Sequence, residues 1–192
     1  MLMNELESYI QSYFGVIDSD EINVISSFFK PTTLSKGEFY LKTGQQSEEL
    51  SFILSGLMRI YVDLETKEVT QWISSQSYFI TDLSSFIFDT PARWNIQALA
   101  DTQLYTIQKE EYNKLGNLIP KWHHLEKLFI AKCFSILEDR IFSHLSMTAE
   151  ERYKFFFEQN KELFNQVPLQ YIASLLGMTP ETFSRIRKKQ LQ

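Results

Sequence analysis

The segment from Val167 to Lys189 constrains the fold most, because its spacing fits two short helices joined by a sharp turn. Two helices that cross closely need a small residue at the crossing, and Ala173 supplies it. Gly177 lies where the chain must turn, and glycine tolerates the positive φ that such a turn often needs. This pattern predicts a helix-turn-helix, with a small core closed by Ile172, Leu176, Met178, Phe183 and Ile186.

The second helix of this pair has a predictable start and a predictable exposed face. Thr179 is a good N-cap, and Pro180 suits the first helical turn. At about 100° per residue, Phe183 and Ile186 turn inward while other side chains turn outward. Arginine can bind guanine bidentately, a carboxylate can accept from cytosine, and flanking cations can bind phosphate. The predicted DNA-contacting set is Thr179, Glu181, Thr182, Ser184, Arg185, Arg187, Lys188 and Lys189.

Charge gives mixed support to DNA binding. The net charge is −5, whereas nucleic-acid-binding domains are usually basic. However, the residues from Thr182 onward include four basic and no acidic ones, although cations also simply complement the dipole at a helix C-terminus. We assign Arg185, which projects away from the predicted core, to a base edge, and Lys189, nearer the flank, to phosphate.

The N-terminus, the longest apolar-rich stretch and the number of cysteines indicate the cellular location and exclude a disulfide. The acidic N-terminus lacks the basic and long apolar regions of a secretory signal. The longest apolar-rich stretch, Leu50 to Val62, is too short to span a bilayer. Cys133 is the single cysteine, so an internal disulfide is excluded. We expect a cytoplasmic protein with no membrane partner.

The order of patterns along the chain predicts an α+β fold. Residues 4–29 have helical periodicity with a break near Gly15–Ser19, and from Pro31 to about Ile107 the pattern becomes β. Many short strands at this spacing indicate a sandwich or a jelly-roll-like β-roll. The predicted strands are Glu38–Leu41, Ser51–Leu54, Met58–Val62, Val69–Ile73, Tyr78–Ile80, Asn95–Leu99 and Leu104–Ile107.

A long helix is predicted from about Ile119 to His144, followed by a capping box at Thr148–Glu151 that opens a helix through Gln159. The long helix carries two apolar stripes. One stripe could pack on the β-domain, and the other is left for a second copy of the chain, unless the whole helix is buried in its own monomer. The stripes are Trp122, Leu125, Phe129 and Ile136, and Ile130, Phe134, Leu137, Ile141 and Leu145.

This order of elements resembles the Crp/Fnr superfamily of bacterial transcription regulators. Lys36-Gly-Glu-Phe-Tyr-Leu-Lys-Thr-Gly44 and the segment 49–61 resemble the first half of a cyclic-nucleotide-binding β-roll, and Thr179–Arg185 resembles the recognition helix. The resemblance implies a β-roll sensor domain with N-terminal helices at 1–117, a dimerisation helix at 118–145 and a helix-turn-helix domain at 146–192.

The resemblance also implies partners. They are double-stranded DNA bound at a palindromic operator by a homodimer, RNA polymerase, and an unidentified small-molecule effector. The chain stops soon after the recognition helix, so we expect the family's C-terminal β-hairpin wing to be reduced or absent.

Departures from the family pattern concern the phosphate-binding cassette. Members that bind cyclic AMP have a short helix opened by Gly-Glu and an Arg that pairs with the cyclic phosphate. Here Gly-Glu is missing, Ala92 occupies the place of that Arg, and Arg93 is displaced by one residue. One residue in a strand-like segment turns a side chain to the opposite face. Cyclic AMP is therefore not expected to bind, and Asp82 and Arg93 are the available ligand-binding substitutes, or else a solvated loop pair.

Other classes of function find little support. Iron–sulfur clusters need several thiolates, and only Cys133 is present. A cupin-type enzyme would take metal ligands from its strands, but His123, His124 and His144 all fall in the helical stretch. We therefore expect no enzyme, no metal and no cofactor. The remaining alternative is a β-roll sensor that acts through protein partners without sequence-specific DNA binding.

Overall fold

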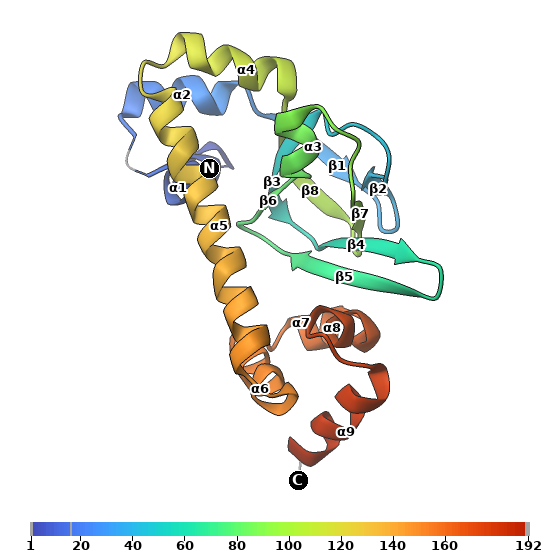
Figure 1. Cartoon of the computed structure of the whole chain (residues 1–192). Coiled ribbons are helices and arrows are strands. Elements are labelled where there is room, and N and C mark those ends of the chain that lie inside the picture. Colours follow the sequence, from blue (N-terminus) through green and yellow to red (C-terminus); the bar gives the residue numbers. More distant parts are fainter. Residues whose placement is uncertain (1, 16, 191–192) are drawn as a thin grey trace.

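The computed structural model describes residues 2–15 and 17–190 and places a β-roll between an N-terminal helical layer and a C-terminal helical unit (Figure 1). The long helix α5 runs alongside and joins the two helical parts. The helices are α1 (Leu2–Phe14), α2 (Ser19–Ser27), α3 (Leu83–Phe88), α4 (Lys109–Leu118), α5 (Trp122–Ser146), α6 (Ala149–Gln159), α7 (Leu163–Gln166), α8 (Leu169–Leu175) and α9 (Pro180–Gln190).

Within the described residues the strands form two four-stranded antiparallel sheets, in the orders β1-β8-β3-β6 and β2-β7-β4-β5. Their inner faces share a core of aliphatic side chains that includes Ile53, Met58 and Ile96. The strands are β1 (Lys30–Leu34), β2 (Phe39–Leu41), β3 (Glu49–Ser55), β4 (Met58–Leu64), β5 (Lys67–Ser74), β6 (Phe79–Ile80), β7 (Asn95–Ala98) and β8 (Thr102–Gln108).

The predicted strands are all found, but two elements of the β-roll were missed. Strand β1 is mostly exposed and contains Pro31, so it has no apolar alternation to reveal it. It lies at a sheet edge, where proline is tolerated, and pairs only with β8. Helix α3 is too short to show a helical period, and only its N-cap, Asp82, marks its start. The β-roll prediction is therefore confirmed, with one strand and one short helix added.

Strand β3 is buried on both faces, which explains the apolar run Phe52–Leu54. Leu50 and Phe52 pack toward the helical layer, while Ile53 faces the interior between the sheets. The helical layer includes α1, whose Phe14 ring stacks on Phe129 of α5 with ring centroids 4.9 Å apart. Burial on both sides therefore joins the β-roll and the first half of α5 into one packed body.

The two predicted stripes of α5 have different fates. Trp122, Leu125 and Phe129 are buried in the core formed with α1 and α4, and α5 begins at Trp122, slightly later than predicted. The second stripe is exposed on the described surface, to 60% at Phe134 and 82% at Leu145. As predicted, one stripe packs within the chain and the other stays open, except that Ile136 of the first stripe is only half-buried.

Two glycines in left-handed backbone provide a matched test of the β-roll. Gly56, with φ +102°, begins the turn into β4, and a Cβ there would lie 2.7 Å from both the Asp101 carbonyl oxygen and the Thr102 Cα. Gly44, with φ +87°, has no atom within 4 Å of an added Cβ.

Gly44→Ala should lower the free energy of unfolding by about 1–2 kcal/mol, the cost of left-handed backbone for a residue with a Cβ. Gly56→Ala should cost a further ~1–3 kcal/mol, because the new methyl group also overlaps backbone atoms that cannot move away. Urea unfolding of the two variants and the parent measures the difference. Equal losses for both variants would contradict the close packing at Gly56.

Candidate functional site

Helices α8 and α9 are joined by a short turn at the positions where the sequence predicts a helix-turn-helix. Ala173 is fully buried at the crossing, and its carbonyl accepts a hydrogen bond from the Met178 amide at 2.9 Å. Gly177 has φ +68°, the left-handed conformation that the turn was expected to require. The five apolar positions predicted for the core are all buried. The local sequence pattern is therefore confirmed residue by residue.

The core of this unit is larger than the helix-turn-helix itself. Tyr153 of α6 lies edge-on to Phe183, with ring centroids 5.3 Å apart, and Phe164 of α7 stacks on Phe183 at 6.1 Å. Helix α6 begins with the predicted capping box, in which Thr148 and Glu151 exchange side-chain and backbone hydrogen bonds. Helix α7 was not predicted, because it is a single turn. These aromatic contacts hold α9 in a fixed orientation.

The start of α9 is polar and negatively charged. The Thr182 amide donates to the Thr179 hydroxyl oxygen at 3.2 Å, which confirms Thr179 as the N-cap. The hydrogen bond from its own backbone amide holds the pKa of the Glu181 carboxyl below its usual value, and Thr179 adds to this effect. Glu181 is therefore an ionised acceptor at neutral pH, next to the helix N-terminus that stabilises its charge.

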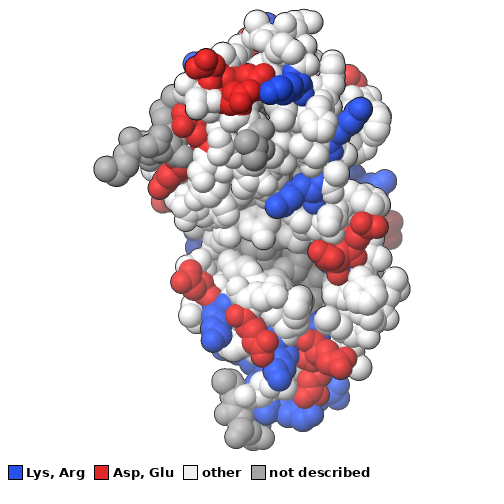
Figure 2. Space-filling view, turned by 90° about the vertical axis from the view of Figure 1, so that its left-hand side faces the viewer, with Lys and Arg blue, Asp and Glu red and all other residues white. Residues whose placement is uncertain are grey.

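The outward side chains of α9 are placed as the helical period predicted. Glu181, Ser184, Arg185 and Lys188 are exposed, and they lie opposite the buried Phe183 and Ile186. Thr179 and Lys189 are also exposed, whereas Thr182 and Arg187 are partly buried. Figure 2 shows Lys and Arg side chains interleaved with Asp and Glu side chains at the C-terminal end of the molecule, below a broad uncharged and hollowed region.

Lys189 is already engaged within the chain. Its Nζ lies 2.9 Å from both carboxylate oxygens of Glu150 in α6, and Gln190 donates to the same carboxylate at 3.1 Å. The sequence analysis assigns Lys189 to DNA phosphate, but it does not reveal the pairing with Glu150. A surface pair of this kind contributes little free energy, so DNA could compete for the lysine, but it must first displace Glu150.

Helix α8 is docked on strand β5 of the β-roll. The Thr70 amide donates to the Ser174 hydroxyl oxygen at 2.9 Å, and this hydroxyl lies 3.4 Å from the Glu68 carbonyl oxygen. The Arg59 guanidinium is 1% exposed and stacks on the Tyr171 ring at 3.6 Å. Arg59 also bonds the Glu68 carboxylate at 2.6 Å. The sequence pattern did not reveal the contacts of Ser174 and Tyr171, because they join residues about a hundred positions apart.

Asp82 and Arg93 do not form a paired ligand site. Asp82 is only 5% exposed, and its two carboxylate oxygens accept from the backbone amides of Ser85, at 3.1 Å, and Arg93, at 3.0 Å. It is therefore neither a free ligand-binding acid nor part of a solvated loop pair. Ala92 is buried in the β-roll core while the Arg93 side chain is exposed, as the one-residue shift predicted.

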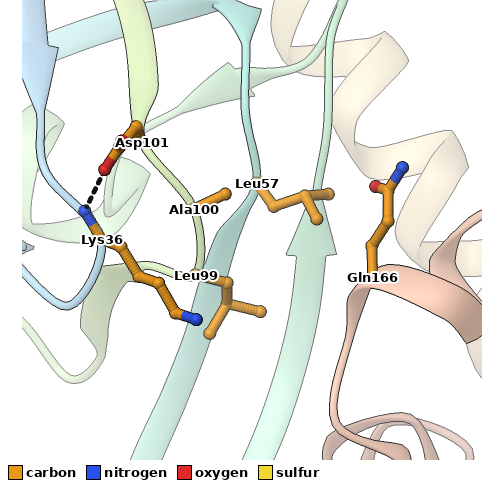
Figure 3. Close-up of a pocket in the computed structure, with 6 residues that line it drawn as sticks. All are labelled: Lys36, Leu57, Leu99, Ala100, Asp101 and Gln166. Carbon is orange, nitrogen blue, oxygen red and sulfur yellow. Dashed lines mark hydrogen bonds between the residues drawn. The ribbon is translucent and has the colours of Figure 1, made fainter.

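A shallow depression lies where the β-roll meets α7, with a volume of about 340 Å³ (Figure 3). Leu57, Leu99 and Ala100 form its apolar floor, and Gln166 faces them from the helical side. The Lys36 amide is bonded to the Asp101 carboxylate at 2.9 Å. With its one acid held by the backbone, this depression offers no cluster of reactive groups.

Residues 2–15 and 17–190 contain neither a metal-ligand cluster nor a membrane-spanning helix. In this part of the chain, no group of three or more His, Cys, Asp or Glu side chains is placed to hold a metal ion. Nor does a helix in these ranges combine the length and apolar character needed to cross a membrane.

The chain resembles known proteins in part of its sequence and in its fold. The family model described as the cyclic nucleotide-binding domain matches residues 31–117, which contain the β-roll and α4. A search of curated proteins finds no significant match.

Three solved structures share the fold of most of this chain. FixK2 from Bradyrhizobium japonicum is 18% identical with a TM-score of 0.70, covering 84% of this chain and 83% of its own. The catabolite activator protein of Thermus thermophilus is 21% identical with a TM-score of 0.57, covering 92% of this chain and 85% of its own. CLP of Xanthomonas campestris, a c-di-GMP-responsive global regulator, is 15% identical with a TM-score of 0.66, covering 91% of this chain and 92% of its own. The predicted α+β fold class is confirmed, and the predicted resemblance to the Crp/Fnr superfamily is confirmed at the level of the fold.

The docking of α8 on β5 can be tested at a single amide. Ser174→Ala removes the oxygen that accepts from the Thr70 amide and leaves that partly buried donor without its partner. An unsatisfied buried donor costs about 1–3 kcal/mol, so hydrogen exchange at the Thr70 amide should accelerate about tenfold or more. Ser184→Ala, at an exposed position of α9, is the control and should leave this exchange rate unchanged. Unaltered exchange in Ser174→Ala would show that α8 is not held at this point.

Proposed function

Since residues 31–117 match the cyclic nucleotide-binding domain family and the chain has the Crp/Fnr fold, we propose that this protein is a transcription regulator that binds DNA through α9. The observation that carries the proposal is the helix-turn-helix with a buried apolar face and an opposite polar face that includes Arg185 and Lys188. The fixed scaffold around Phe183 supports it, because a recognition helix must be presented in one orientation.

Within α9 the proposed roles differ by position. Arg185 is exposed in the middle of the helix and is assigned to a base edge, where its fork can bind guanine. Glu181 is an ionised acceptor suited to cytosine. Lys188 is exposed toward the C-terminal end and is assigned to phosphate. The remaining candidates of the predicted set, Thr179, Thr182, Ser184, Arg187 and Lys189, surround these three.

The regulator is proposed to act as a homodimer through α5. The exposed apolar stripe has the spacing of a helix-to-helix seam and faces away from the core of its own chain. Large contiguous apolar patches on a protein surface usually mark an interaction site. The middle of the face in Figure 2 carries few charges, which supports the same assignment. The stripe consists of Ile130, Phe134, Leu137, Ile141 and Leu145.

The proposed domains are the sensor at 1–117, the dimerisation helix at 118–145 and the DNA-binding unit at 146–192. Two helices related by two-fold symmetry would contact an imperfect palindrome. RNA polymerase and an effector are further proposed partners, and the cytoplasm is the proposed location, where bacterial DNA and polymerase are found.

Cyclic AMP is not the proposed effector. An anion at α3 would need the Ser85 amide, but this amide already donates to a carboxylate oxygen of Asp82. The Arg93 amide donates to the other oxygen of the same carboxylate. The buried methyl group of Ala92 stands where a cationic side chain would be needed. A cyclic phosphate would therefore meet a negative charge rather than a positive one.

DNA recognition is tested by a salt-dependent titration of operator variants. Arg185→Ala should weaken binding by roughly 1–3 kcal/mol and relax the preference at one base position of each half-site. Lys188→Ala should weaken all sequences equally and reduce the salt slope by about one unit. Lys189→Ala should have a smaller effect, because Glu150 already neutralises that lysine.

The control for this titration is a double substitution. In a Glu150→Gln background, Lys189 is released, so Lys189→Ala should lose as much affinity as Lys188→Ala does. Full base preference in Arg185→Ala would show that the recognition helix is oriented differently. If none of these substitutions affects DNA binding, α9 is not the helix that contacts DNA.

Dimer formation is tested by light scattering at micromolar concentration. Phe134→Glu combined with Leu137→Glu should convert a dimer into a monomer, because the charges replace the exposed apolar seam. DNA affinity should fall in parallel. Ser135→Glu is the matched control, since it adds a charge to an exposed position of α5 outside the stripe. A parent protein that is monomeric under these conditions would contradict the proposed dimer.

Cyclic AMP binding is tested by calorimetry. The parent protein should give no detectable binding, because Asp82 occupies the amides and a partner cation is missing. Asp82→Ser keeps an N-cap for α3 but removes the carboxylate, and it should also fail to bind. A micromolar or tighter dissociation constant for the parent would overturn this assignment.

A further inference from the structure

A second cavity lies where the β-roll, the long helix and the DNA-binding unit meet. Its volume is about 520 Å³, which is within the range of small-molecule sites. Strand β5 forms one wall, the second half of α5 another, and helices α6 and α8 close it. Aromatic side chains contribute much of the lining, namely Trp72, Tyr78, Phe142, Phe155 and Phe156. We call this space the junction cavity.

Two arginines reach the junction cavity from different helices. Arg140 of α5 donates to the carbonyl oxygens of Gln71 in β5 and of Leu175 in α8, the latter at 3.2 Å. Its guanidinium also lies over the Trp72 ring, 5.5 Å from the centroid. Arg152 of α6 donates to the Leu176 carbonyl oxygen at 3.1 Å and to the Met147 carbonyl oxygen at 2.7 Å.

These guanidinium groups have no carboxylate partner among residues 2–15 and 17–190. Within 4.0 Å, no Asp or Glu oxygen in these ranges approaches either arginine. Asp139 and His144 also line the cavity. The His144 ring nitrogen Nδ1 lies 2.9 Å from the backbone carbonyl oxygen of Arg140. Burial lowers the pKa of the Arg140 guanidinium, as expected for a charge that lacks a nearby anion.

We propose that the junction cavity binds a small organic anion with an aromatic or apolar body. Partly buried cations are normally compensated by anions, but neither Arg140 nor Arg152 has an ion-paired carboxylate within 4.0 Å among residues 2–15 and 17–190, and Asp139 is a single acid in the lining against these two cations. Arginine binds carboxylates through charge-assisted hydrogen bonds, and the aromatic walls would cover the rest of the ligand. A carboxylate on a one- or two-ring skeleton has the chemistry that both features require.

Such a ligand would also control the DNA-binding unit, a consequence that rests on the proposed function. Arg140 joins β5 to the C-terminal end of α8, and Arg152 holds the next carbonyl of the same helix end. An anion that draws these guanidiniums toward the cavity would weaken their bonds to α8. The position of α9, which follows α8 directly, would then depend on ligand binding.

The test uses calorimetry on the full chain without DNA, so its result does not depend on the proposed function. Naphthalene-2-carboxylate is the probe, and naphthalene-2-carboxamide is the control of the same shape without charge. The carboxylate should bind one molecule per chain, and the carboxamide should bind at least tenfold more weakly. Arg152→Gln should also weaken carboxylate binding about tenfold or more, since a charge-assisted hydrogen bond is lost.

A second variant avoids the arginines, whose backbone contacts also support the fold. Phe155→Ala removes part of an aromatic wall at a half-exposed position, so the variant should fold. It should weaken the binding of both probes. Equal binding of the two probes would overturn the proposal, and so would unchanged binding in both Arg152→Gln and Phe155→Ala. Loss of carboxylate binding only in Arg93→Gln would place the anion at the β-roll and overturn it as well.

Discussion

The structure depends on the two faces of helix α5. One face is buried against the N-terminal helices through Trp122, Leu125 and Phe129, and this packing attaches the helix firmly to the β-roll. The other face is apolar and exposed from Ile130 to Leu145. Because the helix is a single rigid element, whatever covers the exposed face is linked mechanically to the β-roll. The C-terminal helices α6 to α9 follow at its C-terminal end, so α5 connects all three parts of the chain (Figure 1).

The C-terminal unit is held on the β-roll by contacts that the chain makes only once it is folded. Ser174 accepts from the Thr70 amide, Arg59 stacks on Tyr171, and Arg140 reaches Gln71 and Leu175. Strand β5 takes part in each of these groups of contacts, directly or through the Glu68 carboxylate that binds Arg59. The same strand borders the junction cavity. The β4–β5 pair is therefore the route by which the β-roll can influence α8 and α9.

Much of this architecture could be predicted, because its signals are local. The position of Gly177, the N-cap at Thr179 and the buried Phe183 and Ile186 follow from spacing alone. Strand β1 could not be predicted, since an exposed edge strand with Pro31 lacks an apolar period. The partners of Asp82 and Lys189, and the junction cavity, depend on residues distant in the chain. Their geometry exists only after the sheets and α5 have packed.

In the proposed complex, two copies of α9 contact DNA across a two-fold axis. Hydroxyl-radical footprinting of a DNA fragment, selected by this protein from a random pool, tests it most directly. The account predicts two protected patches about one helical turn apart, with similar sequences in inverted orientation. Failure to select any common sequence, or one protected patch without an inverted repeat, would contradict it.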